Sequence, residues 1–565
     1  MNMFKRALIL FVCLVTSLSA ADWKEGLIRE PENMKKIDGK MFYVITSAEE
    51  LAWFAAQVNA GKTTINAQLA NDIKFIEDAS VAISSNSPNW TPIGKDSTVM
   101  FNGIFDGAGR TIYGLYCKQK IAGLFGGTNR DAVVKNIRLK GYIDTYGEFA
   151  GGIVALNWGT ISNCTNSSEI YSWNSNSDIT TKLGGIAGWN AGMISGCMNF
   201  VLHGELGHYI GDLELGGIVG QNEGVIRRCV NVASFNWYYF HGNYTIAIRV
   251  GGIVGRNRGI VTDCVNLGSG PGLYGLAINV DTTAEMLNSF SVMDSAAAGI
   301  IYVNPYSAKS QGAIINCYYD SDVLPDKSTV APNSGMHTSD MQSDRFAWML
   351  NTTNGTAEHS GVWSRDSVGY PIFADSIFKP IYKVFFDDGD ATIFRYSNYK
   401  GLISFPADPE GKEFFGWYTD DGVKVEETTV FTKDLTVRAI FDSTEIPQIS
   451  SSSSSAASSS SGEKSSSSAA SSSSSSSAVK NSSSSSEPSD ALVANLPSPT
   501  WSVTASGRNF QIHAVPVGKP YALFDLQGKV LAEGRIESPE MTLSVPRAGS
   551  YIVRIGERSV RMNAK

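Results

Sequence analysis

The chain has 565 residues, which is more than one hydrophobic core ordinarily holds, so several domains are expected. Its 46 basic and 54 acidic residues are spread along the sequence and give a formal net charge of -8, so no basic cluster suggests nucleic acid as a partner. Fifty-five glycines and only 18% charged residues predict many turns and a β-rich body.

The first segment has the pattern of a signal peptide over residues 1–21. Lys5 and Arg6 precede an apolar run, and small residues at 19–21 then suit a signal peptidase. The run is too short to span a bilayer, and no later segment approaches ~20 uninterrupted apolar residues. We therefore expect an exported mature chain that begins near residue 22, with no transmembrane helix.

A helix is predicted over residues 47–59. Leu51, Phe54 and Val58 have the spacing of one helical face, and Ser47 is a suitable N-cap. Such a helix would cover the open end of the repeat structure that follows, where unpaired strand edges would otherwise invite self-association.

The central part of the chain contains a repeat. Four segments, which begin at Gly151, Gly184, Gly216 and Gly251, read Gly-Gly-Ile-(Val/Ala)-(Gly/Ala)-x-Asn-x-Gly, then an apolar residue and Cys-x-Asn. The starts lie about 33 residues apart, a period that marks a solenoid, propeller or array. Each unit has short β-branched runs and turn glycines without an amphipathic helical stripe, so the sequence favours a parallel β-helix over helical repeats.

In a parallel β-helix, equivalent residues of successive rungs lie ~4.8 Å apart. The turn asparagines are therefore expected to form an amide ladder: Asn157, Asn190, Asn222 and Asn257. The cysteines that follow are expected to form a second stack: Cys164, Cys197, Cys229 and Cys264. Each cysteine comes three positions after an apolar residue that is expected to be buried. Simple strand alternation cannot point both side chains inward, so a bend is expected between them.

The cysteine stack has two interpretations. The rung spacing is compatible with disulfides between adjacent rungs, whereas the frequent burial of cysteine favours an inward stack of free thiols. A metal site is not expected, because no paired C-x-x-C spacing and no clustered histidine accompany these residues.

The repeats resemble the GLUG motif family. The resemblance rests on the four repeats, on a lead-in at residues 43–51, 90–94 (Trp-Thr-Pro-Ile-Gly) and 103–107, and on a close at Trp363 and 369–372 (Gly-Tyr-Pro-Ile), and it covers residues 40–375. Members occur in large surface and secreted bacterial proteins, including some immunoglobulin A proteases. The resemblance implies a structural or adhesive role for the solenoid, which we place at residues 22–378.

Residues 379–443 resemble the internalin-type B repeat, a small β-grasp-like module of surface proteins. The match is carried by the Phe-Gly-Trp-Tyr element at residues 415–418 and by a closing strand at 435–441. Residues 444–489 are largely serine, which predicts a disordered, extended linker.

Residues 490–565 are similar to the C-terminal sorting domain of type IX secretion substrates. Asp-x-x-Gly at residues 525–528 and Gly-x-Tyr-x-Val at 549–553 carry this resemblance. It implies passage across the outer membrane of a Gram-negative bacterium by the type IX secretion machinery, followed by release or attachment at the surface.

Parallel β-helices often act on polysaccharides, so carboxylate pairs were considered. Candidates are Asp106, Asp144, Glu148, Asp212, Glu214, Asp263 and Asp320. Asp106 directly precedes Gly107, which is typical of a turn. Asp263 takes a position held by Asn, Gly and Arg in other repeats, which predicts a solvated slot. No catalytic residue is assigned. The histidines form no H-E-x-x-H, no G-x-S-x-G elbow or calcium loop occurs, and no cofactor or metal is expected.

Aromatic residues in the inserts between motif cores are the best candidates for binding. We single out Tyr171, Trp173, Trp237 and Tyr238 as ligand-binding residues. Inserts at one point of each coil project from one face of the stack, where aromatics could stack sugar rings or grip a partner. The alternative is that these rings pack the inserts onto the solenoid wall.

The sequence thus predicts an all-β protein. It consists of a right-handed parallel β-helix or solenoid with an N-terminal helical cap, a small β-grasp-like module and a C-terminal β-sandwich-like module. The predicted function is that of a secreted or surface-attached, non-catalytic adhesin or binding scaffold, with a polysaccharide or a surface protein as its partner. The alternative is a carbohydrate-active β-helix enzyme, either a polysaccharide lyase or a glycoside hydrolase.

Overall fold

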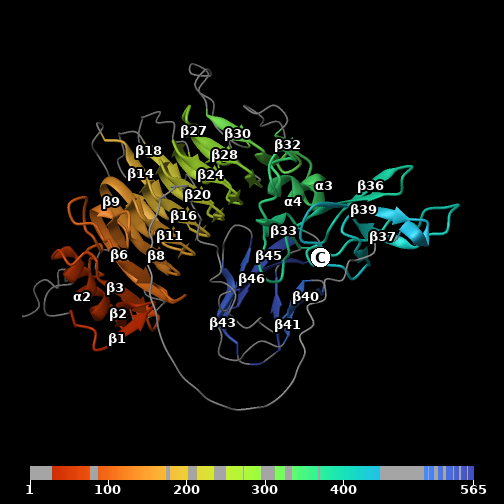
Figure 1. Cartoon of the computed structure of the whole chain (residues 1–565). Helices are drawn as coiled ribbons and strands as arrows, with labels where there is room; N and C mark the ends of the chain where they lie inside the picture. The colour runs from red at the N-terminus through yellow and green to blue at the C-terminus, as the bar shows by residue number, and fades with distance from the viewer. Residues whose placement is uncertain are drawn as a thin grey trace, which may run out of the picture.

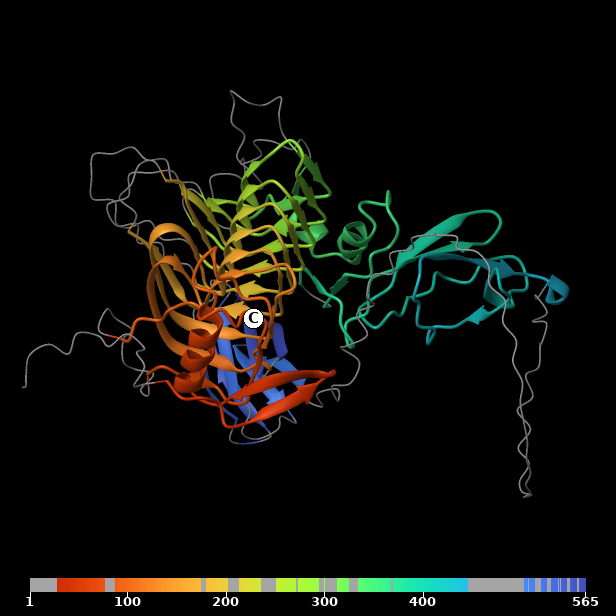
Figure 2. The ribbon, with the colours of Figure 1, turned by 60° about the vertical axis from the view of Figure 1, so that its left-hand side comes forward.

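Three sheets of parallel strands wind along one axis in the computed structural model (Figures 1 and 2). The structure describes residues 28–76, 87–173, 179–201, 213–234, 250–270, 273–293, 299, 312–324, 334–366 and 369–445. It also describes residues 502–506, 508–513, 520–525, 530–536, 538, 540–545, 549–555 and 558–564. The predicted signal peptide and most of the Ser-rich segment lie outside these ranges.

The first sheet, sheet A, has eleven strands and includes one strand from almost every rung. In spatial order they are β1 (Met34–Ile37), β2 (Lys40–Ile45), β3 (Asn66–Leu69), β5 (Ile104–Asp106), β8 (Val133–Lys135), β11 (Thr160–Ser162), β16 (Met193–Ser195), β20 (Val225–Arg227), β24 (Ile260–Thr262), β28 (Glu285–Leu287) and β30 (Ala313–Ile315). Only β1 is antiparallel to its neighbour; the others pair in parallel.

The second and third sheets complete each turn of the solenoid. Sheet C contains β7 (Phe125–Thr128), β10 (Val154–Asn157), β15 (Ala187–Asn190), β19 (Val219–Asn222), β23 (Val254–Asn257) and β27 (Ala277–Val280). Sheet B contains β4 (Ile73–Lys74), β6 (Thr111–Ala122), β9 (Arg138–Gly151), β12 (Thr165–Asn166), β13 (Glu169–Ser172), β14 (Thr181–Gly184), β17 (Met198–Asn199), β18 (Leu213–Gly216), β21 (Val230–Asn231), β22 (Val250–Gly251), β25 (Val265–Asn266), β26 (Leu273–Tyr274), β29 (Phe290–Ser291), β31 (Tyr318–Asp320) and β32 (Gly335–Met336).

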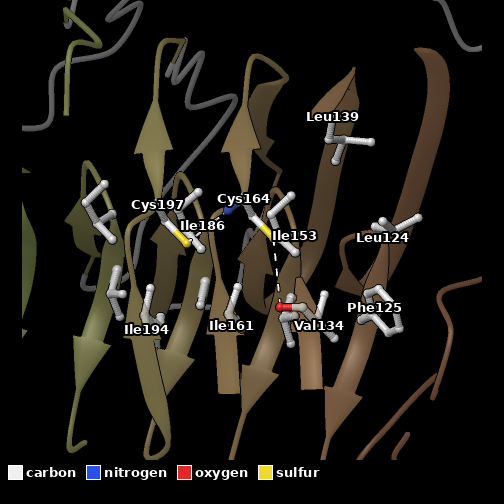
Figure 3. Close-up of a cluster of buried hydrophobic side chains, with 14 of the residues drawn as sticks. Leu124, Phe125, Val134, Leu139, Ile153, Ile161, Cys164, Ile186, Ile194 and Cys197 are labelled. Carbon is white, nitrogen blue, oxygen red and sulfur yellow. Dashed lines mark hydrogen bonds between the residues drawn. The ribbon is translucent and has the colours of Figure 1, made fainter. Parts of the chain in front are cut away.

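Equivalent residues of the four repeats lie beside one another in this arrangement. Ile161 pairs with Ile194, Ile194 with Ile226, and Ile226 with Val261, all in parallel register. These side chains are fully buried, and stacks of this kind form one continuous core along the axis (Figure 3). The predicted all-β class and parallel solenoid architecture are therefore confirmed.

A left-handed turn residue joins sheet A to the next strand of sheet B in each repeat. Asn163, Gly196, Arg228 and Asp263 have φ angles of 53°, 62°, 54° and 54°. This turn is the bend that the spacing of Ile161 and Cys164 required, since it lets both side chains point inward. Asparagine, glycine and aspartate adopt the left-handed region at little cost, whereas arginine rarely does.

The glycine pairs of the repeat pack closely against the next rung and against an asparagine of sheet B. A Cβ atom on Gly185 would lie 2.2 Å from the Gly217 carbonyl oxygen and 2.2 Å from Cγ of Asn199. No larger residue fits at this position, which explains why each repeat begins with two glycines.

Both asparagines of the repeat motif form amide ladders along the solenoid. Nδ2 of Asn157 donates to Oδ1 of Asn190 at 2.7 Å, and the same bond at 2.8 Å joins Asn190 to Asn222 and Asn222 to Asn257. This ladder confirms the prediction. A second ladder, which was not predicted, runs through Asn166, Asn199, Asn231 and Asn266 with distances of 2.9, 3.1 and 2.8 Å.

The predicted N-terminal helix is confirmed as α2 (Ala48–Asn59), and Ser47 caps it by accepting a hydrogen bond from the backbone N–H of Glu50. Leu51, Phe54 and Val58 are fully buried in the solenoid core. Phe54 packs edge-to-face against Phe105 of β5, with ring centroids 5.8 Å apart. The helix lies at the N-terminal end of the stack (Figure 1), where it covers the first rungs.

Beyond the last rung, the chain folds against the outside of sheet B. Helices α3 (Thr338–Met341) and α4 (Asp344–Asn351) and the hairpin β33 (Trp363–Arg365) and β34 (Pro371–Phe373) share a buried cluster with Val265 and Phe290 of the solenoid. Among the described residues, no helix is long and apolar enough to cross a membrane.

Two small β-modules follow. One sheet contains β36 (Thr392–Tyr396), β35 (Lys383–Asp387), β39 (Leu435–Ile440), β37 (Gly416–Thr419) and β38 (Lys424–Val425), with β35 and β39 parallel as in a β-grasp, and a 3-10 turn follows at Ser443–Glu445. The C-terminal module has a sheet of β40 (Ser502–Ser506), β41 (Asn509–His513) and β44 (Met541–Ser544), and another of β43 (Val530–Arg535), β42 (Pro520–Asp525), β45 (Gly549–Ile555) and β46 (Arg558–Ala564). Both of its sheets contribute to one core, which gives the sandwich that was predicted.

Candidate functional site

The outer face of sheet B carries a group of aromatic side chains near the N-terminal end of the solenoid. In the parallel register of β6, β9 and β13, Tyr116 lies opposite Tyr142, and Asp144 lies between Lys118 and Tyr171. Alternate residues of a strand point to the same face, so these side chains share one surface. The residues between them point into the core: Cys117, Ile143 and Ile170.

Three of the aromatic rings contact one another in a row, and Trp173 lies beyond it; together we call them the aromatic strip (Tyr116, Tyr142, Tyr171 and Trp173). Tyr142 and Tyr171 stack with centroids 4.5 Å apart and an interplanar angle of 18°. Tyr116 and Tyr142 follow at 5.6 Å and 32°. Trp173 extends the row just after β13, where its backbone N–H donates to the Thr145 carbonyl, and its side chain is 45% exposed.

A lysine and an aspartate lie within the strip. Nζ of Lys118 forms an ion pair with Oδ2 of Asp144 at 2.9 Å and lies 5.7 Å from the Trp173 ring centroid. Asp144 is almost completely buried, and its Oδ1 atom has no hydrogen-bond partner among the described residues. Burial raises the pKa of the Asp144 carboxyl, although the Lys118 ammonium acts in the opposite direction. The hydrogen bond to Asp144 raises the pKa of Lys118.

The structure thus brings together two of the four predicted binding residues, Tyr171 and Trp173. Trp237 and Tyr238 lie outside the described residues. Tyr116, Tyr142, Lys118 and Asp144 were not assigned from the sequence, because β6 and the first half of β9 precede the four recognisable repeats. The alternation of Tyr142, Asp144 and Tyr146 along β9 is the signal that could have placed them on one outer face.

The other carboxylates considered from the sequence have separate partners. Oδ1 of Asp106 accepts a hydrogen bond from the backbone N–H of Ala108 at 2.8 Å, in agreement with the turn-forming role predicted for it. Glu148 pairs with Lys182 at 2.6 Å, and Glu214 with Arg256 at 3.5 Å. Asp212 lies outside the described residues.

Two further carboxylates are buried by the segment that follows the solenoid. Asp263 was predicted to lie in a solvated slot, and this prediction is wrong: it is only 8% exposed, because Trp363 covers it and donates a hydrogen bond to it. Asp320 is 1% exposed and accepts hydrogen bonds from the hydroxyl groups of Thr338 and Tyr370.

The cysteine stack points inward, as one of the two interpretations predicted. All six described cysteines are buried free thiols: Cys117, Cys164, Cys197, Cys229, Cys264 and Cys317. The backbone N–H of Cys164 points to Sγ of Cys197 at 3.5 Å, one rung away (Figure 3). Burial raises the pKa of Cys117 and that of Cys317 to about 12. Within the described part of the chain, no group of three or more His, Cys, Asp or Glu side chains could hold a metal ion.

With this geometry, the chain belongs to the class of all-β proteins built around a parallel β-solenoid. No family model matches it, and no curated protein does. Among solved structures, it is similar to one described as a "putative immunoglobulin A1 protease" from Bacteroides ovatus. The two share 17% sequence identity with a TM-score of 0.36, over 63% of this chain and 99% of that one.

Proposed function

We propose that this chain is an exported bacterial protein, secreted or attached to the outer cell surface, whose solenoid is a non-catalytic scaffold that binds carbohydrate at the aromatic strip. The observation that carries this proposal is the buried carboxylate of Asp144, whose Oδ1 atom has no hydrogen-bond partner among the described residues. It lies between the Lys118 side chain and the Tyr171 ring, on a surface that otherwise presents aromatic rings.

A buried acceptor without a hydrogen bond costs about 1–3 kcal/mol, and more when it is charged. A purely structural role for Asp144 would be served better by an apolar residue of similar size. Sugar hydroxyl groups can supply the missing donor, and aromatic faces pack well against the apolar faces of pyranose rings. A small rotation of the Lys118 side chain, which is 44% exposed, would open Asp144 to such a hydroxyl group.

Export is supported by the two ends of the sequence. Residues 1–21 have the pattern of a signal peptide, and residues 490–565 resemble a type IX sorting domain behind a Ser-rich segment at 444–489. In this proposal, the Ser-rich segment is a flexible tether, and the solenoid with its GLUG-like repeats and the B-repeat-like module at 379–443 are displayed outside the cell. The assignment of these segments to the GLUG, internalin and type IX families is part of the proposal.

Co-sedimentation of the mature chain (residues 22–565) with a panel of insoluble polysaccharides tests this function, provided that the supernatants are also analysed for released sugar. We expect binding without release, and a clear loss of binding in Trp173→Ala. Phe394→Ala is a matched control, because Phe394 is a similarly exposed aromatic residue on β36, at 46%.

Two outcomes would contradict the proposal. Release of sugar would favour the alternative, a glycoside hydrolase or polysaccharide lyase. Absence of binding to every polysaccharide would leave a surface protein as the partner and would remove carbohydrate from the proposed role.

A further inference from the structure

A second group of aromatic and polar side chains lies on the outside of sheet C. We propose that it is an additional carbohydrate-binding surface, which takes a neutral polysaccharide lying along the solenoid axis. For its class of ligand, this proposal rests on the proposed function. The surface itself is independent of the aromatic strip, because different strands carry it.

The surface is built by the repeat itself. In the register of sheet C, Trp189 lies opposite Gln221, and Gln221 lies opposite Arg256. Two positions later in each rung come the turn residues of a second, parallel row: Trp158, Ala191, Glu223, Arg258 and Asp281. We call the side chains of Trp158, Trp189, Gln221, Glu223, Arg256 and Arg258 the sheet C surface.

The two tryptophans form its apolar end. The ring centroids of Trp158 and Trp189 lie 4.4 Å apart at an interplanar angle of 54°. Both side chains are partly exposed, and neither belongs to the buried core. The small side chain of Ala191 lies beside Trp158 in the next rung, so it leaves room for the two rings to meet. A tilted pair of indoles offers an apolar platform for a sugar ring.

Its polar end is held in place by a network of hydrogen bonds. Oε1 of Glu223 accepts from Nε2 of Gln221 at 2.7 Å and from Nη1 of Arg258 at 3.3 Å. Asp281 joins both arginines, with 2.8 Å to Nε of Arg258 and 3.1 Å to Nη2 of Arg256. Because these side chains are fixed before a ligand arrives, they lose little conformational entropy on binding.

Glu214 of β18 provides an independent indication of a ligand. Its Oε1 atom pairs with Nη1 of Arg256 at 3.5 Å, whereas its Oε2 atom is buried and has no hydrogen-bond partner among the described residues. Burial raises the pKa of this carboxyl. Glu214 therefore adds an acidic side chain with one unsatisfied oxygen to the polar end of the sheet C surface, beside Arg256.

Charge and spacing select the class of ligand. The two arginines, Arg256 and Arg258, pair with three carboxylates, those of Glu214, Glu223 and Asp281, so this surface does not favour a polyanion. Successive rungs lie ~4.8 Å apart, a spacing close to the length of one pyranose unit in an extended chain. A neutral polysaccharide along the axis could thus stack on the tryptophan pair and place hydroxyl groups at Glu223, whose side chain is 37% exposed.

The test measures binding of the mature chain and its variants to cellulose and to β-mannan as neutral probes, with polygalacturonate as an acidic probe. We expect Trp189→Ala to raise the apparent Kd for a neutral probe by roughly fivefold, as the loss of one aromatic contact predicts. Trp189→Tyr should lose less, since it keeps a ring at this position. Trp173→Ala reports on the aromatic strip, Phe394→Ala is the control, and thermal melting establishes that each variant is folded.

The outcomes separate the two sites. A loss in Trp189→Ala supports the sheet C surface, whether or not Trp173→Ala also loses affinity. A loss in Trp173→Ala alone overturns the sheet C surface and leaves the proposed function intact. Affinities unchanged in both variants overturn both sites, and binding to polygalacturonate but to neither neutral probe overturns the ligand class proposed here.

Discussion

The indole Nε1 of Trp363 donates a hydrogen bond to Oδ1 of Asp263, 2.9 Å away in space and 100 residues earlier in the sequence. Asp263 occupies the left-handed turn position of its rung, and Trp363 is fully buried at the start of β33. The Trp363 ring also packs against Phe290 of the solenoid, with centroids 5.6 Å apart. This contact fixes the closing hairpin against the last rungs.

The burial of Asp263 makes stability depend on pH. Burial raises the pKa of this carboxyl, against the effect of its hydrogen bonds with Thr262 and Trp363. The folded state therefore binds the proton more tightly than the unfolded state, and this residue stabilises the fold more as the pH falls below the raised pKa. We expect Asp263→Asn, which keeps an acceptor and suits the turn, to raise the melting temperature at pH 7. The advantage should shrink as the pH is lowered towards 4.

Trp363→Phe is the companion variant. It keeps an aromatic ring in the hairpin but removes the donor, so a buried acceptor loses a partner at a cost of about 1–3 kcal/mol. Thermal melting should show a lower midpoint than the wild type at pH 7. A midpoint equal to that of the wild type would mean that the hydrogen bond contributes nothing to holding the hairpin in place.

The predicted amide ladder and the wrong prediction for Asp263 together show which features of the fold the sequence alone could predict. The amide ladder through Asn157 and Asn190 was predictable, because a fixed repeat period places equivalent residues side by side whatever surrounds them. The same reasoning failed for Asp263, because its burial comes from a tryptophan outside the repeats. Variation at this position of the repeat was interpreted as solvent exposure, whereas the feature that Asn163, Gly196, Arg228 and Asp263 share is a left-handed φ.

The candidate site was partly predictable for a related reason. Tyr171 and Trp173 lie inside a recognisable repeat, so their place on an outer face followed from its geometry. Asp144 and Tyr116 lie on the long strands β9 and β6, whose pairing has bulges that no repeat pattern in the sequence reveals. That the Asp144 carboxylate is buried and lacks one hydrogen bond depends on side-chain packing, which strand periodicity does not determine.

Asn190 tests the energetic weight of the amide ladder. Its side chain accepts from Nδ2 of Asn157 and donates to Oδ1 of Asn222 and to the Gly192 carbonyl. Asn190→Ala leaves these buried groups unpaired, and we expect a loss of about 3 kcal/mol or more in the free energy of unfolding, measured by denaturant titration. Asn163→Gly is the matched control, because it removes an amide outside the ladder and preserves the left-handed turn. Equal effects of the two substitutions would contradict the importance of the ladder.

The buried thiols predict a pattern of chemical reactivity. The cysteine side chains point into the core, where a reagent cannot reach them. Burial also raises the pKa of Cys117 and that of Cys317 to about 12, so these two thiols stay protonated at neutral pH. A thiol-specific chromogenic reagent should detect no cysteine in the folded mature chain and all six after denaturation without reductant. Detection of fewer than six in denaturant would indicate disulfides between rungs.

The pH dependence of carbohydrate binding tests the role of Asp144. A ligand hydroxyl forms a stronger hydrogen bond with Oδ1 when the carboxylate is ionised, and burial raises the pKa of this carboxyl above its ordinary 3.8. As the pH falls, the group therefore takes up a proton earlier than an exposed aspartate does, and its ion pair with Lys118 is lost at the same time. We expect affinity at the aromatic strip to decline at mildly acidic pH and to recover when the sample is returned to pH 7.

Asp144→Asn should bind weakly at every pH and lose this dependence, whereas Glu148→Gln, on the same strand but paired with Lys182, should retain it. If the affinity of the wild type stays constant down to the pH at which an exposed aspartate takes up its proton, Asp144 has no part in ligand binding. Its buried carboxylate would then serve only to pair with Lys118.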